Sequence, residues 1–226
     1  MKRTKVKFIS TVAILVFLAL VVFIFLQQNG SDKSNSSNSE SDNAIEGGLI
    51  IGDPNAKATL VEFADYKCPL CNRFHQTTFK ELEAKYISSG KLKISAHPLP
   101  FIGPDSGTAA EGAFCANDQG KFAKYNDRVL NYMWDTYYKT NNFQVEGEQI
   151  LTRSKLIDLG KEVGIEEIKF AECLNTSSHI NSVQTELNTA KNNGVSGTPT
   201  FFIGGQKVVG AQPFAVFEPL IEAQLK

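Results

Sequence analysis

Residues 61–71 read VEFADYKCPLC, an apolar stretch that leads directly into two cysteines with two residues between them. The apolar and partly β-branched side chains predict a strand over 58–64. Pro69 fits the first turn of a helix, where its missing N–H would have no partner in any case. The stretch therefore predicts a strand that gives way to a helix at Cys68.

The segments that follow predict an α/β fold. A helix over 69–88 and a strand over 91–96 complete a βαβ unit, whose two strands run parallel. Between residues 103 and 164 the pattern predicts helices and no strand, and a Gly-Gly hairpin and an amphipathic helix close the chain. The elements expected after the βαβ unit are helices over 108–117, 121–138, 153–163, 166–175 and 177–192, strands over 200–203 and 206–209, and a helix over 213–225.

The composition and charge of the chain argue against a nucleic-acid partner. The chain has 226 residues, 42% of them hydrophobic, which is enough for one large domain or two small ones. The formal charge is 23 − 24 = −1, and from residue 31 onward it is 19 − 24 = −5, a mildly acidic body without a basic stripe. The four basic residues that precede residue 31 are Lys2, Arg3, Lys5 and Lys7.

Residues 8–26 predict a membrane anchor. Only Ser10 and Thr11 are polar in this run, and a helix of this length spans roughly 28 Å, close to the hydrocarbon core of a bilayer. The basic residues ahead of the run place the N-terminus in the cytoplasm and the rest of the chain outside. A cleaved signal peptide is the alternative, but the bulky residues 23–28 do not match a small-residue cleavage site.

A Ser/Asn-rich segment follows the anchor and predicts a flexible tether, because it has no apolar side chain to bury. The folded part then contains a discontinuous α/β domain that a helical insertion interrupts. The expected boundaries are 1–26 for the basic segment and anchor, 27–47 for the tether, 48–104 and 180–226 for the α/β domain, and 105–179 for the insertion.

The two motif cysteines predict redox chemistry. Cys68 at a helix N-terminus faces unpaired N–H groups and the positive end of the dipole, which stabilise a thiolate and lower its pKa. Cys71 lies one turn further in, shielded, as the resolving thiol. One alternative is a zinc site that adds His75, but the sequence has no second ligand pair of the usual spacing. The other is a purely structural disulfide between Cys68 and Cys71, although a disulfide that closes a loop of only four residues is an unusual stabilising cross-link.

A second motif, GTPTFFIGG at residues 197–205, places Pro199 at the entrance of an apolar strand. A proline there is compatible with a cis peptide bond, which usually marks a fixed loop shape. Alone the Thr-Pro pair is weak evidence, and it gains weight from the βαβ unit with its two cysteines.

With these two motifs, residues 48–226 resemble the thioredoxin superfamily and, within it, the DsbA-like thiol–disulfide oxidoreductases of the membrane-anchored Gram-positive type. The resemblance implies a thioredoxin fold with an inserted all-helical subdomain. It also implies that Cys68 is the nucleophile, that Cys71 resolves the mixed disulfide, and that a cis-Pro199 packs against the pair and helps to bind the substrate chain. Pro69, Leu70 and Thr198 are the supporting residues of the site.

The chain departs from the family pattern at two positions. Leu70 stands where the best-known DsbA has a histidine that helps to stabilise the thiolate, which implies a weaker oxidant. Thr198 before the proline also occurs in isomerase-type relatives, so this residue does not decide between oxidase and isomerase.

Other polar residues near the motif have two interpretations each. Relatives carry an acid at the position of Glu62 that relays protons to the resolving cysteine, and the alternative is a solvent-facing strand position. The charge of Lys67 could favour the Cys68 thiolate, but we expect this lysine to be solvated. His75 and His97 are expected to be surface or hydrogen-bonded residues without a role.

Cys115 and Cys173 remain once Cys68 and Cys71 pair locally. In an oxidising space they should form a structural disulfide, and helical insertions of relatives often carry one. Two buried free thiols are the alternative.

The leading hypothesis is an extracytoplasmic thiol–disulfide oxidase that needs no cofactor besides its Cys68–Cys71 disulfide and holds no metal. The expected partners are reduced or unfolded secreted and surface proteins and, by resemblance, a DsbB-like quinone-linked membrane protein that reoxidises the pair. A reductase or isomerase of the same fold is one alternative. A metal-binding or chaperone-like module that uses Cys68, Cys71 and His75 is the other.

Overall fold

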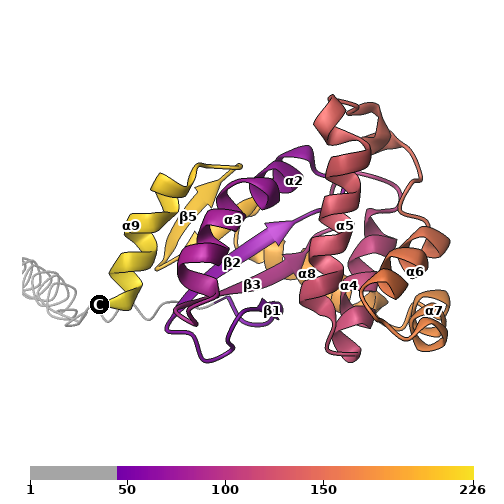
Figure 1. Ribbon diagram of the computed structural model, residues 1–226, viewed down its shortest axis with the longest axis horizontal. Coiled ribbons are helices and arrows are strands. Elements are labelled where there is room, and N and C mark those ends of the chain that lie inside the picture. The colour runs from indigo at the N-terminus through magenta and orange to yellow at the C-terminus, as the bar shows by residue number, and fades with distance from the viewer. Residues whose placement is uncertain (1–44) are drawn as a thin grey trace, which may run out of the picture. The chain divides into compact units, whose positions relative to one another are not determined.

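The computed structural model describes residues 45–226, and its centre is a single sheet (Figure 1). The strands lie in the order β1-β3-β2-β4-β5. Strand β2 runs parallel to β3 and antiparallel to β4, and the outer strands β1 and β5 pair antiparallel with their neighbours. The strand bounds are β1 (Leu49–Ile51), β2 (Ala58–Ala64), β3 (Leu92–Pro98), β4 (Thr200–Ile203) and β5 (Gln206–Val209).

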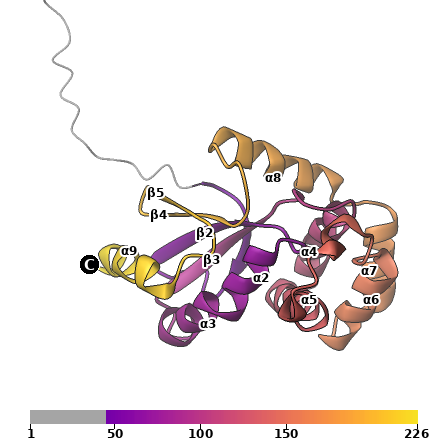
Figure 2. The same ribbon diagram turned by 90° about the horizontal axis from the view of Figure 1, so that it is seen from above.

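Helices cover both faces of this sheet. Figure 2 shows α8 on one side and α2, α3 and α9 on the other. Their bounds are α2 (Pro69–Gln76), α3 (Thr78–Leu82), α8 (Ile180–Asn192) and α9 (Phe214–Leu225). Two layers of helix around a sheet bury apolar side chains on each face, which β2 requires because its residues alternate between the faces.

Two clusters of buried side chains show this alternation. Leu60 of β2 belongs to the large core, where the ring of Phe74 lies 4.4 Å from that of Phe201 and 5.6 Å from that of Phe217. Phe63 of β2 belongs to a second cluster, which includes Ala190 of α8. The middle of the central strand, residues 60–63, is therefore buried on both sides, and a polar residue there loses its contact with water.

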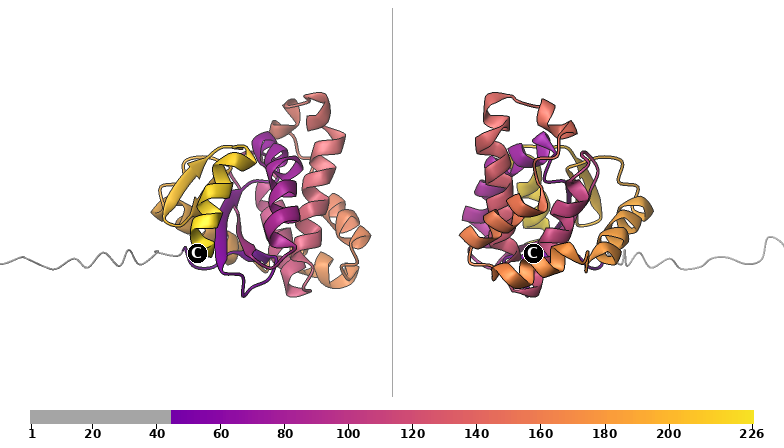
Figure 3. Two further views of the ribbon diagram at one scale, coloured as in Figure 1. Left: turned by 60° about the vertical axis from the view of Figure 1, so that its left-hand side comes forward. Right: turned by 90° about the vertical axis from the view of Figure 1, so that its right-hand side faces the viewer.

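A block of four helices separates β3 from α8 in the sequence, and the views of Figure 3 show it beside the sheet. Two 3₁₀ turns, Tyr138–Thr140 and Gln144–Gly147, connect α5 to α6. The helix bounds are α4 (Ser106–Asp118), α5 (Phe122–Thr136), α6 (Arg153–Glu162) and α7 (Glu167–Asn175). This block is the helical insertion that the sequence predicts within an α/β fold.

The expected single helix over 69–88 is wrong, because the structure divides it into α2, α3 and a π-helical turn, Glu83–Ile87. The break lies at Thr77, whose backbone leaves the helical region and whose hydroxyl donates to the carbonyl of Arg73. The hydroxyl of Thr78 donates to the carbonyl of Gln212, ahead of α9. Hydroxyls that bond to carbonyls in this way compete with the helical ladder.

Two smaller differences concern short elements. The sequence does not predict β1, because three residues are too few to show a period. The helix expected over 121–138 ends at Thr136, and Tyr138 begins a 3₁₀ turn instead.

The expected anchor over residues 8–26 and most of the tether lie outside the described residues. Within 45–226, no helix combines the length and the apolar character that a membrane span requires.

Candidate active site

Cys68 lies at the N-terminus of α2, where the sequence places it. Its backbone is extended (φ −80°, ψ 118°), and Pro69 occupies the first helical position. The amide N–H of Cys71 donates to the Cys68 sulfur at 3.4 Å, so the thiol itself caps the helix. Cys68 as a whole residue is 3% exposed.

The late Thr-Pro motif meets the cysteines at this point. The Thr198–Pro199 bond is cis, and the Cys68 thiol donates a hydrogen bond of 3.2 Å to the carbonyl oxygen of Thr198. Pro199 is buried and Leu70 is exposed beside the pair. Residues 130 positions apart in the sequence thus form one site.

The two thiols have opposite shifts in pKa. A hydrogen bond from the Cys71 thiol is the main cause that lowers the pKa of Cys68 to about 7. Burial opposes it, and the side chain of Thr198 and the amides of Cys71 and Leu70 lower the pKa further. Burial raises the pKa of Cys71, and its hydrogen bond to Cys68 raises it again. Cys68 is therefore the thiol that ionises first, and both are free thiols in this structure.

Glu62 of β2 is buried in this region. Desolvation raises its pKa to about 7, and the negative charge of Cys68 adds to the shift. The charge of Glu62 in turn raises the pKa of Cys71. Of the two positions considered for this residue, the structure has the buried one, where the carboxyl group can gain or lose a proton near neutral pH.

The carboxylate of Asp65 organises the loop that leads to the cysteines. It accepts hydrogen bonds from the backbone N–H of Lys67 at 2.8 Å, from those of Phe101 and Ile102 at 2.7 Å each, and from the hydroxyl of Ser106 at 2.9 Å. Burial raises the pKa of Asp65, and these four donors oppose the rise. The loop after β2 is thereby tied to the segment between β3 and α4.

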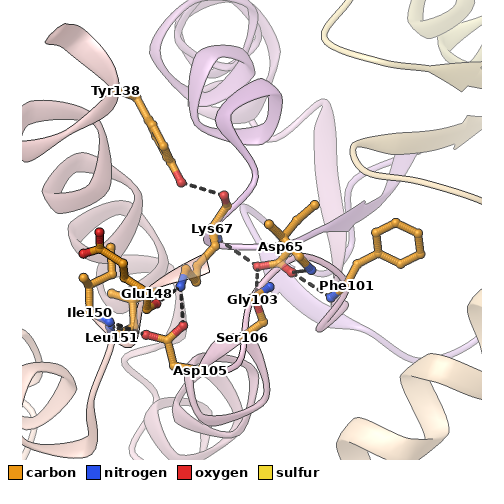
Figure 4. Close-up of polar contacts among 11 residues, drawn as sticks. Asp65, Lys67, Phe101, Gly103, Asp105, Ser106, Tyr138, Glu148, Ile150 and Leu151 are labelled. Atoms are coloured by element: carbon orange, nitrogen blue, oxygen red, sulfur yellow. Dashed lines mark hydrogen bonds and ion pairs between the residues drawn. The ribbon is translucent and has the colours of Figure 1, made fainter. Parts of the chain in front are cut away.

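The expectation of a solvated Lys67 is wrong. Its side chain is 0% exposed, and its ammonium forms an ion pair of 2.6 Å with Asp105 and donates to the carbonyl of Glu148 (Figure 4). The other carboxylate oxygen of Asp105 accepts from the backbone N–H groups of Ile150 and Leu151. A lysine in a short loop is nearly always solvated, so the sequence has no signal for this burial.

The histidines take part in structural pairs. His75 Nε2 lies 2.9 Å from a carboxylate oxygen of Asp127, and His97 Nδ1 lies 2.5 Å from one of Glu186. The position of His75 thus gives the zinc alternative no support.

The remaining cysteines are joined in the insertion. A disulfide links Cys115 of α4 to Cys173 of α7, across 58 positions of sequence. The imidazole of His179 lies near both sulfurs, but these sulfurs are bonded to each other and are therefore not free thiolates that could bind a metal ion.

Known proteins show similarity along most of the chain. The family model described as "Thioredoxin" matches residues 44–223. "Probable disulfide bond formation protein D" of Bacillus anthracis is 25% identical over 222 residues, which cover 96% of this chain and 94% of that protein. "Disulfide bond formation protein D" of Bacillus subtilis is 27% identical over 186 residues, which cover 81% of this chain and 79% of that protein.

Solved structures share the fold. The oxidised form of BdbD from Bacillus subtilis superimposes with a TM-score of 0.70 and 23% identity, over 80% of this chain and 95% of that one. The α-DsbA1 of Wolbachia pipientis gives a TM-score of 0.63 at 22% identity, over 78% and 89% of the two chains. These matches confirm the α/β thioredoxin fold with a helical insertion. With the family match over most of its length, they show that the chain belongs to the thioredoxin family.

Proposed function

We propose that this protein is a DsbA-like thiol–disulfide oxidoreductase that donates its Cys68–Cys71 disulfide to substrate proteins. One observation carries the proposal: a thiol with a pKa of about 7 lies at a helix N-terminus against the cis Thr198–Pro199 bond. The similarity to disulfide bond formation proteins supports the same activity. No cofactor besides the cysteine pair is needed for the reaction.

The reaction starts from the oxidised pair. A substrate thiolate attacks the sulfur of Cys68, a bond forms between these two sulfurs, and the Cys68–Cys71 bond breaks. Cys71 leaves as a thiolate and takes up a proton, because its pKa is raised. Glu62, with a pKa of about 7, can supply that proton.

A second substrate thiolate then attacks the substrate sulfur of the mixed disulfide. The substrate disulfide forms, Cys68 leaves as a thiolate, and the protein remains as the dithiol. A lower pKa makes Cys68 the better leaving group, so the arrangement favours this direction. Pro69, Leu70, Thr198 and Pro199 surround the sulfur and would contact the substrate chain.

Refolding of a reduced, disulfide-containing protein tests this mechanism. With oxidised glutathione as the oxidant in the assay, we expect Cys68→Ser to abolish turnover. Cys71→Ser, whose Cys68–glutathione disulfide a substrate thiolate can attack with release of glutathione, should accumulate mixed disulfides on Cys68 that non-reducing electrophoresis detects. Unchanged turnover in Cys68→Ser would refute the mechanism.

A reductase or isomerase is the second candidate, because the pKa of Cys68, although lowered, is lowered less than that of DsbA. The value of about 7 equals that of thioredoxin, about 7, rather than that of DsbA, about 3.5. Equilibration with glutathione decides between the directions. A potential of about −120 mV, the DsbA value, agrees with the oxidase. One of about −180 mV, the value of protein disulfide isomerase, would identify an isomerase, and one of about −270 mV, the thioredoxin value, would identify a reductase.

We also propose that residues 1–26 anchor the protein in the cell membrane with its N-terminus in the cytoplasm, and that the tether 27–47 holds the catalytic domain outside. The apolar run and the basic residues ahead of it support this location. Secreted or surface proteins are then the substrates, and a DsbB-like quinone-linked membrane protein is the reoxidant. The catalytic domain would comprise 48–104 and 180–226, interrupted by 105–179.

Membrane fractionation tests the anchor. We expect the full chain to stay in the membrane pellet after alkaline extraction and a variant that lacks residues 1–26 to be absent from it. Recovery of a shortened chain in the culture medium would show cleavage and contradict the anchor.

A further inference from the structure

Three successive backbone carbonyls at the nucleophile accept hydrogen bonds from side chains. The amide nitrogen of Asn72 donates to the carbonyl of Tyr66 at 2.8 Å and to that of Cys68 at 2.9 Å. The hydroxyl of Tyr138 donates to the carbonyl between them, that of Lys67, at 2.6 Å. Asn72 belongs to α2 itself, whereas Tyr138 belongs to the helical insertion.

Lys67 is held by the insertion at a second point. Its carbonyl bonds to Tyr138, and its ammonium pairs with Asp105 at the start of α4 (Figure 4). Tyr138 is 3% exposed, and its ring stacks on that of Phe143 with 6.1 Å between centroids. Packing thus restrains the ring of Tyr138, so its hydroxyl can hold the Lys67 carbonyl in a fixed position.

We propose that Tyr138 is a positioning residue for Cys68: with the Lys67–Asp105 pair, it lets the helical insertion hold the peptide from which the nucleophilic sulfur projects. The inference rests on the proposed function in taking Cys68 as the nucleophile. It adds that the insertion, which lies beside the sheet, controls the chemistry of the cysteine pair.

The physical reason lies in the peptide unit that joins Lys67 to Cys68. Its carbonyl oxygen is the negative end of a dipole next to the thiolate, and the hydroxyl hydrogen of Tyr138 offsets that charge. Without the hydroxyl, a buried carbonyl loses its donor, and the peptide plane is held only at its other side, where the N–H of Cys68 donates to the carbonyl of Asp65 at 3.0 Å. Both effects destabilise the Cys68 thiolate, so they raise its pKa and make it a poorer leaving group.

The experiment compares Tyr138→Phe with a matched control, Tyr137→Phe. Each change removes one hydroxyl from neighbouring residues, but the hydroxyl of Tyr137 bonds to that of Tyr132 at 3.2 Å and not to the active-site loop. For the full-length chain, thiolate absorbance against pH gives the pKa of Cys68, and equilibration with glutathione gives the ratio of disulfide to dithiol.

We expect Tyr138→Phe to raise the pKa of Cys68 and to shift the glutathione equilibrium about three- to tenfold toward the protein disulfide, the effect of one hydrogen bond. The glutathione equilibrium of Tyr137→Phe should match that of the wild type within about twofold, because the hydrogen bond that this variant loses does not involve the active-site loop. Thermal unfolding of both variants separates this effect from a loss of stability.

Two outcomes overturn the inference: a Tyr138→Phe protein that is less stable but has the wild-type pKa and equilibrium, or equal shifts in both variants. A wild-type protein whose cysteines do not equilibrate with glutathione at all would instead contradict the proposed function.

Discussion

At the scale of single residues, the active site gives two identical side chains, those of Cys68 and Cys71, different tendencies to ionise. Cys68 and Cys71 lie one helical turn apart, but hydrogen bonds outweigh burial at Cys68 and stabilise its ionised form, whereas burial at Cys71 outweighs the one backbone hydrogen bond, at Asp65, that lowers its pKa. Position along the helix therefore decides which sulfur a substrate attacks and which one must take up a proton.

The ionisation of Cys68 links the stability of the reduced protein to pH. The fold lowers the pKa from its ordinary value of 9.0 to about 7, so the ionised thiolate stabilises the reduced fold fully above pH 9. This contribution, about 2–3 kcal/mol for such a shift, is lost as the pH falls through about 7. Urea unfolding under reducing conditions should show the loss between pH 9 and pH 6 in the wild type and not in Cys68→Ser. Identical pH profiles for the two proteins would contradict the assignment.

A second prediction at this scale concerns Glu62. Glu62→Gln removes the group placed to protonate Cys71, and general acid catalysis of this kind contributes about 10²-fold or more. We expect the single-turnover rate of the oxidised protein with glutathione, expressed per glutathione thiolate, to fall by about that factor. The wild-type rate should also decrease as the pH rises through the pKa of Glu62, which burial, the main cause of its shift, keeps raised in the oxidised protein too, and the variant should lack this dependence.

Glu111→Gln is the control, because it makes the same change at another buried glutamate, in α4. Equal rates in Glu62→Gln and the wild type would exclude the proton-donor role.

At the scale of elements, the packing of α4 against α5 fixes the insertion that carries Tyr138. Gly112 of α4 lies against Tyr125 of α5, and a Cβ atom at Gly112 would be 2.2 Å from the Tyr125 hydroxyl oxygen. The two helices approach this closely because the position has no side chain.

Gly112→Ala should therefore destabilise the protein by about 1–3 kcal/mol, the usual cost of overpacking. Gly107→Ala is the matched control in the same helix, because a Cβ there meets nothing within 4 Å. It should be neutral or stabilising by up to about 1 kcal/mol, since alanine favours the helix. Chemical denaturation of both variants measures the difference, and equal effects would contradict the packing argument.

At the scale of the whole molecule, the chain combines a sheet with a helical block that carries its own covalent link. The disulfide between Cys115 and Cys173 joins α4 to α7, so it closes a loop that contains most of the insertion. The block can then hold the active-site loop from a restrained position.

Removal of this link should weaken the fold considerably. By loop-closure entropy, 58 positions of separation correspond to about 4 kcal/mol, so we expect the double variant Cys115→Ala, Cys173→Ala to lose up to that amount. Urea unfolding gives the value. Two alkylatable thiols at these positions in the untreated protein would show instead that the link does not form.

Local patterns determined much of this architecture. Apolar residues followed by Cys-Pro-Leu-Cys predict a strand that leads into a helix capped by a thiol, and that arrangement is observed at β2 and α2. Gly204 and Gly205 predict the hairpin between β4 and β5, and both have positive φ values, 53° and 72°. These features depend on neighbours in the sequence, whose spacing fixes backbone geometry whatever surrounds them.

Only the tertiary structure decided the features that depend on distant partners. The break at Thr77 accompanies a bond from Thr78 to Gln212, and the burial of Lys67 depends on Asp105. The contact of Tyr138 with the backbone beside Cys68 spans 71 positions. A charged or hydroxyl side chain has the same local preference whether it is solvated or buried, and only the partner that the fold brings to it determines which state has the lower free energy.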